Sequence, residues 1–509
     1  ATCVGWWMWP DDIARSGRAR RGFDNIMVSA DREIVVVGAG ISGLAAAWRL
    51  RQAGIDVGVL EGGEKVGGYA RPERRAGFLL EKGPFNVLVR DASFEALLDD
   101  FAGEVQVVAA DKAAGNRYLY RRGELCRVPT NPLAMLTTSL LSVGGRLRLL
   151  GGLFVSKAAD QSEQTIEQAA SRRLGREAAD TLVSAAIAGI YAGDISKLSL
   201  SACFPKVAEV DAETRSLIGY GLRAAVRRKK GGSGRSGRWR GMVNCDGGLG
   251  ALTSAIGARL GERLMTECRV EELHSVDGGY ALVYRRGRGG RDSLYARRIV
   301  LALPVEAASG LLEDVCPDGA EALGGIESAS AVVLNLGYRR EDIEHPLNGF
   351  GFLVPRNEPE VPVMGVLWAD STFPHVAPAG YRLLRVFLGG ARDPDAVKRS
   401  DGELLRMAEG PLRKALGVIG SPMLVDVCRH PAAIPQYHCG HASKIARLEA
   451  AIGRQPGLSV IGNFLHGISV NDCVRVAMQC AERVIEARRH GTVPSAPVAE
   501  CCEHYAFPQ

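Results

Sequence analysis

The sequence has no long hydrophobic run and no cysteine or histidine pattern typical of a metal site. No stretch of about 18 consecutive apolar residues occurs, so the sequence predicts no transmembrane helix. The 12 cysteines include no CxxC pair, and none of the 9 histidines stands in an HExxH pattern, so no metal ion is expected. Scattered cysteines of this kind are typical of reduced thiols in a cytoplasmic protein.

The excess of positive charge is also small. A net charge of +6 over 509 residues can attract anionic substrates or acidic lipids, but it does not indicate a nucleic-acid partner. The length predicts two or three domains, and the composition is that of an ordinary globular protein. Residues 1–26 carry tryptophans followed by arginines, the reverse of the order in a signal peptide. We therefore expect residues 1–30 to be a disordered or non-native extension.

One stretch of the sequence predicts a complete βαβ unit. Residues 33–38 and 56–61 are short apolar runs typical of buried strands, and residues 43–53 between them have helical spacing. The loop that joins the first strand to the helix contains the pattern GxGxxG, which is a weak signal alone and a strong one in this context. A dinucleotide bound there would place its phosphates at the helix N-terminus, where unpaired N–H groups favour anions.

Each glycine of this loop has a separate expected role. Gly38 permits a tight turn, Gly40 lets the backbone approach a pyrophosphate, and Gly43 lets the helix pack on the strand. Glu61 ends the second strand, where a carboxylate can accept hydrogen bonds from ribose hydroxyls. The alternative is a tight strand–helix turn that binds no ligand.

Two further segments favour FAD over NAD. The spacing from Glu61 to Gly67-Gly68 resembles the ExxxxxGG extension of amine-oxidase-like flavoproteins, and Gly462-Asn463 after a predicted strand resembles their second FAD segment. The cofactor-binding residues expected on this basis are Gly38, Gly40, Ile41, Ser42, Gly43, Glu61, Gly62, Lys65, Gly67, Gly68, Gly83, Pro84, Phe85, Asn86, Val270, Gly462, Asn463, Ile468, Ser469 and Val470.

Five motifs in chain order resemble those of the oxygen-dependent protoporphyrinogen oxidase family. They lie within a resemblance that runs from about Glu33 to Arg488, and none is decisive alone, but their order over that length is specific. The motifs are EKGP at 81–84, GIYAGD with LSL at 189–194 and 198–200, HPLNGFGFLVP at 345–355, AIPQY with GH at 433–437 and 440–441, and VNDC at 470–473.

The resemblance implies a mixed fold, α/β with α+β. Its parts are a discontinuous Rossmann-like FAD domain, an antiparallel-sheet substrate domain and a helical membrane-facing domain. The expected divisions are the FAD domain at 31–110, 240–320 and 431–490, a helical, membrane-facing and substrate region at 111–228, the substrate domain at 321–430 and a tail at 491–509. Leucines at helical spacing in 133–154 suit an interfacial helix, with a plain core helix as the equal alternative.

The resemblance also implies the reaction: an FAD-dependent oxidase converts a porphyrinogen to the porphyrin in haem biosynthesis. Six electrons leave in three rounds, O2 is the acceptor and H2O2 is formed. The flavin N5 carries the chemistry, so we assign no catalytic side chain. The expected substrate residues are Arg90, as the propionate partner, with Gly189, Gly193, Phe350, Leu353, Trp368 and His466. Core packing is the alternative for Phe350, Leu353 and Trp368, and a solvated surface position is the alternative for Arg90.

Two departures from the family pattern keep other functions open. Phe85-Asn86 stands where relatives commonly have Asn/Asp-Ser, and Leu465-His466 stands where many have Tyr and a polar residue. A paralogous FAD oxidase or desaturase acting on an unrelated metabolite is the first alternative, and a non-catalytic flavoprotein scaffold is the second. Proto- and coproporphyrinogen, a homodimer, and peripheral contact with the inner face of a membrane are also left open.

Overall fold

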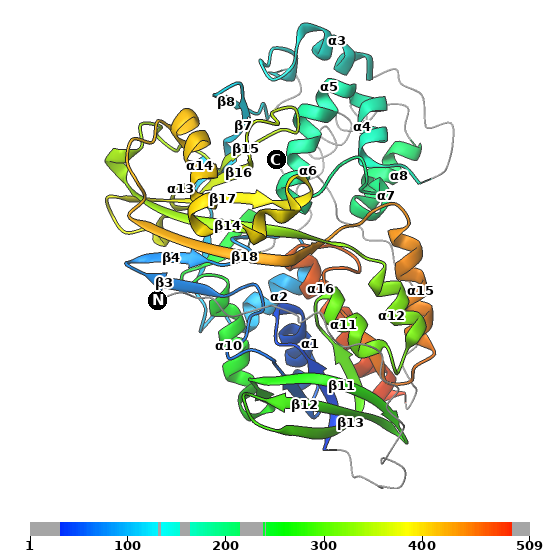
Figure 1. Ribbon diagram of the computed structural model, residues 1–509. Helices are drawn as coiled ribbons and strands as arrows, with labels where there is room; N and C mark the ends of the chain where they lie inside the picture. The colour runs from blue at the N-terminus through cyan, green and yellow to red at the C-terminus, as the bar shows by residue number, and fades with distance from the viewer. Residues whose placement is uncertain (1–30, 131–133, 153–162, 214–237, 240, 491–509) are drawn as a thin grey trace.

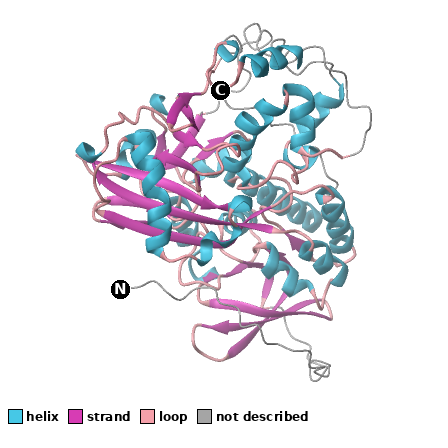
Figure 2. Ribbon diagram, turned by 45° about the horizontal axis from the view of Figure 1, so that its top comes forward, coloured by secondary structure: helices cyan, strands magenta, loops and turns pink. Residues whose placement is uncertain are grey.

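The computed structural model describes residues 31–130, 134–152, 163–213, 238–239 and 241–490 (Figure 1). The expected extension at 1–30 and the tail at 491–509 therefore lie outside the described residues. Figure 1 shows three tiers, with a group of helices at the top, one sheet in the middle and a second sheet at the bottom. Figure 2 shows the strands gathered in two separate groups.

The lower sheet is built from three distant parts of the chain. Its strand order is β10-β2-β1-β13-β12-β11, and β19 also pairs with β13. The pairs that involve β1, β2, β10 and β19 are parallel, whereas β11 and β12 form an antiparallel extension. The strands are β1 (Arg32–Val37), β2 (Val57–Leu60), β10 (Leu264–Met265), β11 (Cys268–Val276), β12 (Gly279–Arg286), β13 (Arg291–Leu301) and β19 (Leu458–Val460).

Helices cover this sheet and complete one core. Apolar side chains of residues 34–105, 243–326 and 445–485 belong to a single buried cluster, so the three segments fold together. In β1 the residues from Ile34 to Val37 are all buried, as a parallel strand covered on both faces requires. The helices are α1 (Ile41–Gln52), α2 (Ala92–Asp100), α10 (Gly250–Leu260), α11 (Val305–Leu312), α12 (Pro317–Gly324), α15 (His441–Gly453) and α16 (Val470–Arg489).

The middle sheet has the order β18-β14-β17-β16-β15-β7-β8 and is antiparallel except where β15 pairs with β7. Helix α14 (Asp401–Leu416) packs on one face, and it begins with a capping box formed by Ser400 and Glu403. The strands are β7 (Arg117–Arg121), β8 (Glu124–Arg127), β14 (Ser328–Arg339), β15 (Gly351–Leu353), β16 (Val363–Trp368), β17 (Tyr381–Gly389) and β18 (Leu424–Pro435). Strands β7 and β8 lie in the range that we expected to be the helical, membrane-facing and substrate region, and the helical layer begins after them.

Two small sheets and one short helix accompany the two large sheets. Strand β5 (Val87–Val89), β9 (Gly241–Cys245) and β6 (Val107–Ala109) form a small sheet, and β3 (Pro72–Arg75) pairs with β4 (Phe78–Glu81). Helix α13 (Ala369–Thr372) follows β16 directly.

The upper layer consists of short helices. Residues 166–190, whose apolar spacing is helical, do not form one helix, because Gly175 has φ +91° and ends α4. The leucine-rich stretch around 133–154 contains α3, and its first and last residues lie outside the described part. The helices are α3 (Val143–Gly151), α4 (Ile166–Leu174), α5 (Arg176–Ala178), α6 (Ser184–Tyr191), α7 (Leu200–Cys203) and α8 (Pro205–Glu213).

Candidate dinucleotide and substrate site

One large cavity runs between the two sheets and up to the helical layer. Its volume is about 2930 Å³, and its lining extends from Glu61 and Arg269 at the lower sheet to Leu182 and Val207 in the helical layer. Pockets for single small ligands usually measure about 300–1,000 Å³. The cavity therefore has room for a dinucleotide and a second large molecule.

The glycine loop after β1 leaves an opening on this cavity. A Cβ at Gly38 would lie 2.4 Å from the Ala302 carbonyl oxygen, and one at Gly43 would lie 1.9 Å from the Gly38 carbonyl oxygen, so backbone packing requires both glycines. Gly40 differs, since its φ of −70° and ψ of 175° suit any residue and a Cβ there would meet only the Gly68 Cα at 4.0 Å. The space in front of Gly40 is therefore free for a ligand.

Helix α1 begins at this opening and is suited to bind an anion. Its N-cap, Gly40, provides no side-chain hydrogen bond, and its first turn has no acidic residue. Ile41 and Ser42 of that turn line the cavity. The first N–H groups of a helix lack intrahelical partners and carry a partial positive charge, so this end fits a pyrophosphate.

Glu61 is held in place at the tip of the lower sheet. Its Oε2 accepts a hydrogen bond from the N–H of Ala39 and its Oε1 from the N–H of Gly63, both at 2.8 Å. Glu61 also lines the cavity. Because a carboxylate has more lone pairs than these two donors occupy, Glu61 can still accept hydrogen bonds from ribose hydroxyls.

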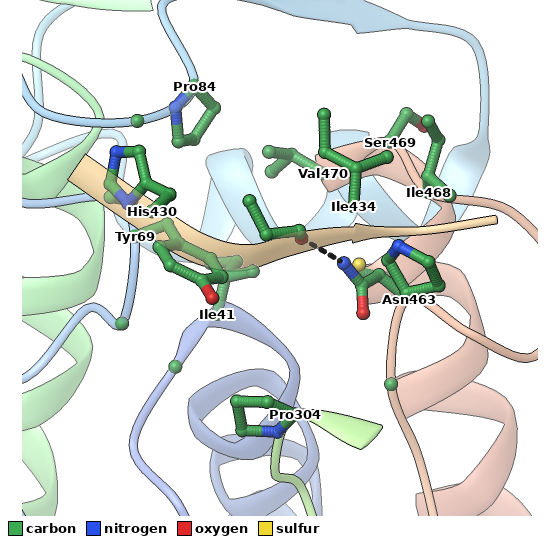
Figure 3. Close-up of a pocket in the computed structure, with 18 of the residues that line it drawn as sticks. Ile41, Tyr69, Pro84, Pro304, His430, Ile434, Asn463, Ile468, Ser469 and Val470 are labelled. Carbon is green, nitrogen blue, oxygen red and sulfur yellow. Dashed lines mark hydrogen bonds between the residues drawn. The ribbon is translucent and has the colours of Figure 1, made fainter. Parts of the chain in front are cut away.

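The segment between β19 and α16 forms a second wall of the cavity (Figure 3). The Asn463 side chain donates to the Ala433 carbonyl of β18 at 3.5 Å, and the Tyr437 hydroxyl donates to the Asn463 carbonyl at 2.7 Å. Helix α16 then begins at Val470 and is capped by Ser469, whose side chain accepts from the N–H of Asp472. In Figure 3 Asn463 and Ser469 lie toward the right-hand end of the β18 ribbon, and Tyr69 and His430 lie toward its left-hand end.

The loop after β4 is fixed from behind by a buried arginine. Arg385 is fully buried and donates to the carbonyls of Glu81 and Gly83 at 3.1 and 2.9 Å. Its guanidinium lies 5.0 Å from the Phe85 ring centroid, and Phe85 also contacts Phe373 edge-on at 5.3 Å. These two contacts fix the position of the Phe85 ring. Gly83, Pro84 and Asn86 of the same loop line the cavity.

Glu81 beneath this loop gives a testable pH dependence. Burial raises its pKa from 4.5 to about 7, against the lowering effect of the Leu249 N–H, of Arg385 and of Asn244. Because the raised pKa belongs to the folded state, the contribution of Glu81 to stability falls as pH rises from 4.5 towards 7. We expect the free energy of unfolding of the wild type, relative to Glu81→Gln, to fall by on the order of 2–3 kcal/mol between about pH 5 and pH 8. Urea unfolding of both proteins at both pH values measures this, and parallel pH profiles would contradict it.

The structure brings most of the predicted site residues to this one cavity. Of the expected substrate residues, Arg90, Gly189, Phe350 and Leu353 line it. Of the expected cofactor residues, Gly43 alone does not line it, because Gly43 packs against Gly38 instead. The others line it: Gly38, Gly40, Ile41, Ser42, Glu61, Gly62, Lys65, Gly67, Gly68, Gly83, Pro84, Phe85, Asn86, Val270, Gly462, Asn463, Ile468, Ser469 and Val470.

Three predicted substrate residues lie elsewhere. Trp368 is fully buried in the core against Tyr118 and His345, with ring centroids 5.3 and 4.8 Å apart, and its neighbour Leu367 lines the cavity in its place. This difference follows from the alternation of side chains along β16. The structure therefore puts Trp368 outside the cavity lining, in contrast to its expected place at the substrate.

Gly193 and His466 also lie outside the lining. A Cβ at Gly193 would meet the Gln436 side chain at 2.5 Å, so this glycine serves packing within the protein. The His466 Nε2 lies 3.0 Å from Glu449 Oε1, beside a separate cavity of about 870 Å³. The direction of the loop after Gly462 decides this position, and the sequence does not reveal it.

Sequence reasoning missed several residues of the upper cavity. Leu119, Leu182, Val207 and Leu367 line it together with Arg117. Arg117 reaches the site because β7 pairs in parallel with β15, which aligns Arg117 with Gly351. No sequence spacing reveals that Arg117 and Gly351 are neighbours. An arginine within a predicted apolar strand could, however, have indicated a binding residue.

Comparisons with known proteins agree with this geometry. The family model described as flavin containing amine oxidoreductase matches residues 41–485. The chain is 31% identical to the chloroplastic protoporphyrinogen oxidase of Nicotiana tabacum, over 90% of this chain and 86% of that protein. It is 27% identical to the coproporphyrinogen III oxidase of Bacillus subtilis (strain 168), over 88% of this chain and 97% of that protein.

Solved structures are similar as well. A candidate protoporphyrinogen oxidase from Exiguobacterium sp. 255-15 superimposes with a TM-score of 0.75 at 25% identity, covering 90% of this chain and 99% of that one. Cyclohexylamine oxidase from Brevibacterium oxydans IH-35A gives a TM-score of 0.65 at 18% identity, over 90% of this chain and 100% of that one, which shows a shared fold.

Proposed function

Because the chain belongs to the flavin-containing amine oxidoreductase family, and within it to the protoporphyrinogen oxidase group, we propose that it oxidises a porphyrinogen to the porphyrin in haem biosynthesis. FAD is the cofactor of this oxidoreductase. The substrate is protoporphyrinogen IX or coproporphyrinogen III, since its relatives are named protoporphyrinogen oxidase and coproporphyrinogen III oxidase. The observation that carries the proposal is the single cavity that joins the dinucleotide end to a large apolar end.

Residues at the two ends of this cavity have different proposed roles. FAD supplies a two-electron acceptor when bound. The N-terminus of α1 and Glu61 would hold its pyrophosphate and ribose, and the loop after β4 and the start of α16 line the space beyond them. Apolar side chains such as Phe350 and Leu353 exclude water around the macrocycle and present a flat wall to it.

Oxygen is the proposed electron acceptor. Conversion of a porphyrinogen to a porphyrin removes six electrons and six protons, so three O2 would be reduced to three H2O2 for each porphyrin formed. The test is an aerobic assay of the FAD-loaded protein with each porphyrinogen, following porphyrin fluorescence and O2 uptake together. The proposal expects three O2 consumed per porphyrin above the uncatalysed rate. Porphyrin formation no faster than in a protein-free control would overturn it.

The structure gives no support to the alternative of a paralogue with an unrelated substrate. Phe85 and His466, the two departures from the family pattern, suggested that alternative. His466 lies outside the main cavity, and Phe85 packs against Arg385 and Phe373 with 5% of its surface exposed. Phe85 lines the cavity from a position that this packing fixes, and His466 does not reach the cavity, so neither departure is evidence for a different substrate.

The upper helical layer supports a peripheral contact with a lipid surface. Among the described residues no helix is both long and apolar enough to cross a membrane. On α3, however, Val143, Leu147 and Leu150 are exposed by 66, 63 and 38%, and Arg146 and Arg148 lie between them. An exposed apolar stripe flanked by arginines suits the interface of an anionic bilayer. Ile190 on α6 lines the cavity and is itself 47% exposed, which suits entry of an apolar substrate from this side.

Replacing one leucine of this stripe tests the lipid contact. We expect Leu147→Glu to lower binding to vesicles that contain anionic lipid by roughly tenfold, because a buried leucine contributes about 1.5–3 kcal/mol and the new carboxylate is repelled. Vesicle co-sedimentation measures the effect. Ile419→Glu is the matched control, since Ile419 is 69% exposed and lies outside the helical layer. Equal losses in the two variants, or none in either, would contradict the contact.

A further inference from the structure

Strand β7 carries a cation into the apolar end of the cavity. Along β7, Leu119 belongs to a small apolar cluster with Leu140 and Ala185 of the helical region, whereas Tyr120 packs in the core of the middle sheet. Arg117 lies two residues before Leu119, on the same face of the strand, and it lines the cavity. The strand therefore presents an arginine beside Leu119, at the wall where Phe350 and Leu353 also lie.

Within the described part of the chain, the structure gives Arg117 no compensating negative charge. Its guanidinium lies over the Phe350 ring, 5.9 Å from the ring centroid, and burial lowers its pKa, with no carboxylate acting in the opposite direction. Among the described residues no acidic side chain forms an ion pair with it. A half-buried cation in apolar surroundings is costly unless an anion reaches it.

Several other buried or half-buried arginines form ion pairs with carboxylates. Arg173 forms an ion pair with Asp211 at 2.5 Å, and Arg356 contacts both Asp180 and Glu167. Arg121, at the other end of β7, lies 3.9 Å from Glu177. Each of these arginines faces a carboxylate of the protein, whereas Arg117 faces the cavity.

On the basis of the proposed function, we propose that Arg117 binds a carboxylate of the porphyrinogen and is a second anchor beside Arg90. The two residues reach the cavity from different elements. Arg90 follows β5, and its backbone N–H donates to Asn471 at the start of α16, whereas Arg117 begins β7 in the middle sheet. Arg117 is thus a positioning residue that orients the macrocycle by its rim, through the bidentate geometry that guanidinium offers to a carboxylate.

The test compares a free-acid substrate with its uncharged ester. Coproporphyrinogen III and its tetramethyl ester, dispersed in the same detergent, are assayed with the FAD-loaded wild type, Arg117→Met, Arg117→Lys and Arg121→Met. For Arg117→Met we expect KM for the free acid to rise on the order of 10- to 100-fold, with KM for the ester and the flavin content unchanged. Arg117→Lys should recover part of the loss, and Arg121→Met should leave the ratio of the two KM values as in the wild type.

Two other results have distinct meanings. If Arg117→Met raises KM equally for acid and ester, or raises neither, Arg117 is a packing residue and the inference is wrong, while the proposed function stands. If the wild type oxidises neither compound nor protoporphyrinogen IX, the proposed function fails, and the inference fails with it. Should Arg117→Met not fold, the same acid-to-ester ratio in Arg117→Lys decides the question.

Discussion

Gly40→Val is expected to give a folded protein that contains almost no FAD. The backbone at Gly40 is extended and a Cβ there meets only the Gly68 Cα at 4.0 Å, so valine fits the chain without strain. Its methyl groups, however, would occupy the space in front of the α1 N-terminus that the pyrophosphate needs. We expect flavin content and oxidase activity to fall by on the order of 100-fold or more, since the phosphates lose their main contacts.

The absorbance of flavin released from purified protein measures this loss. Circular dichroism and thermal unfolding at saturating and zero FAD establish whether the variant folds. Gly103→Val is the matched control, because Gly103 lies in the turn after α2 with nothing within 4 Å of an added Cβ and does not line the cavity. A Gly40→Val protein that retains stoichiometric FAD would show that the loop after β1 does not hold the cofactor.

Gly189→Val is expected to reduce oxidation of porphyrinogen without loss of FAD. A Cβ at Gly189 on α6 would lie 3.0 Å from the Leu353 Cδ2, so valine pushes Leu353, which lines the cavity. Overpacking of this kind costs about 1–3 kcal/mol, and if that cost falls on the bound substrate, kcat/KM drops roughly 10- to 100-fold.

A second substitution tests the same cause. Leu353→Ala removes the side chain that Gly189→Val displaces, so Gly189→Val should lower kcat/KM much less in the Leu353→Ala background than in the wild type. The double-mutant cycle isolates the contact between the two positions, because both single variants and the pair are assayed with one substrate. Additive losses in the double variant would mean that Gly189 and Leu353 do not act together on the substrate space.

The local segments of the fold were predictable because each carries its own signal. The βαβ unit formed by β1, α1 and β2 has a strand, a glycine loop and a helix within one short stretch, and α16 follows a polar cap with a long amphipathic pattern. These local signals were sufficient to predict the dinucleotide end of the site. The family motifs added the order of the distant FAD segments.

The upper cavity was less predictable because it depends on pairing between distant strands. Strands β7 and β15 are separated by more than 200 residues, and only their parallel register puts Arg117 beside Phe350. Trp368 lies outside the cavity for a related reason, since a shift of one residue along a strand moves a side chain to the opposite face of the sheet. Side-chain direction there follows from tertiary pairing and not from the local pattern.

The central claim is that one cavity holds FAD at its lower end and a porphyrinogen at its upper end. Anaerobic mixing of the FAD-loaded protein with protoporphyrinogen IX, and separately with coproporphyrinogen III, tests it most directly. The account predicts that at least one of them bleaches the visible flavin absorbance within the time of a turnover while porphyrin absorbance appears. Flavin that neither compound bleaches, although dithionite reduces it fully, would contradict the account.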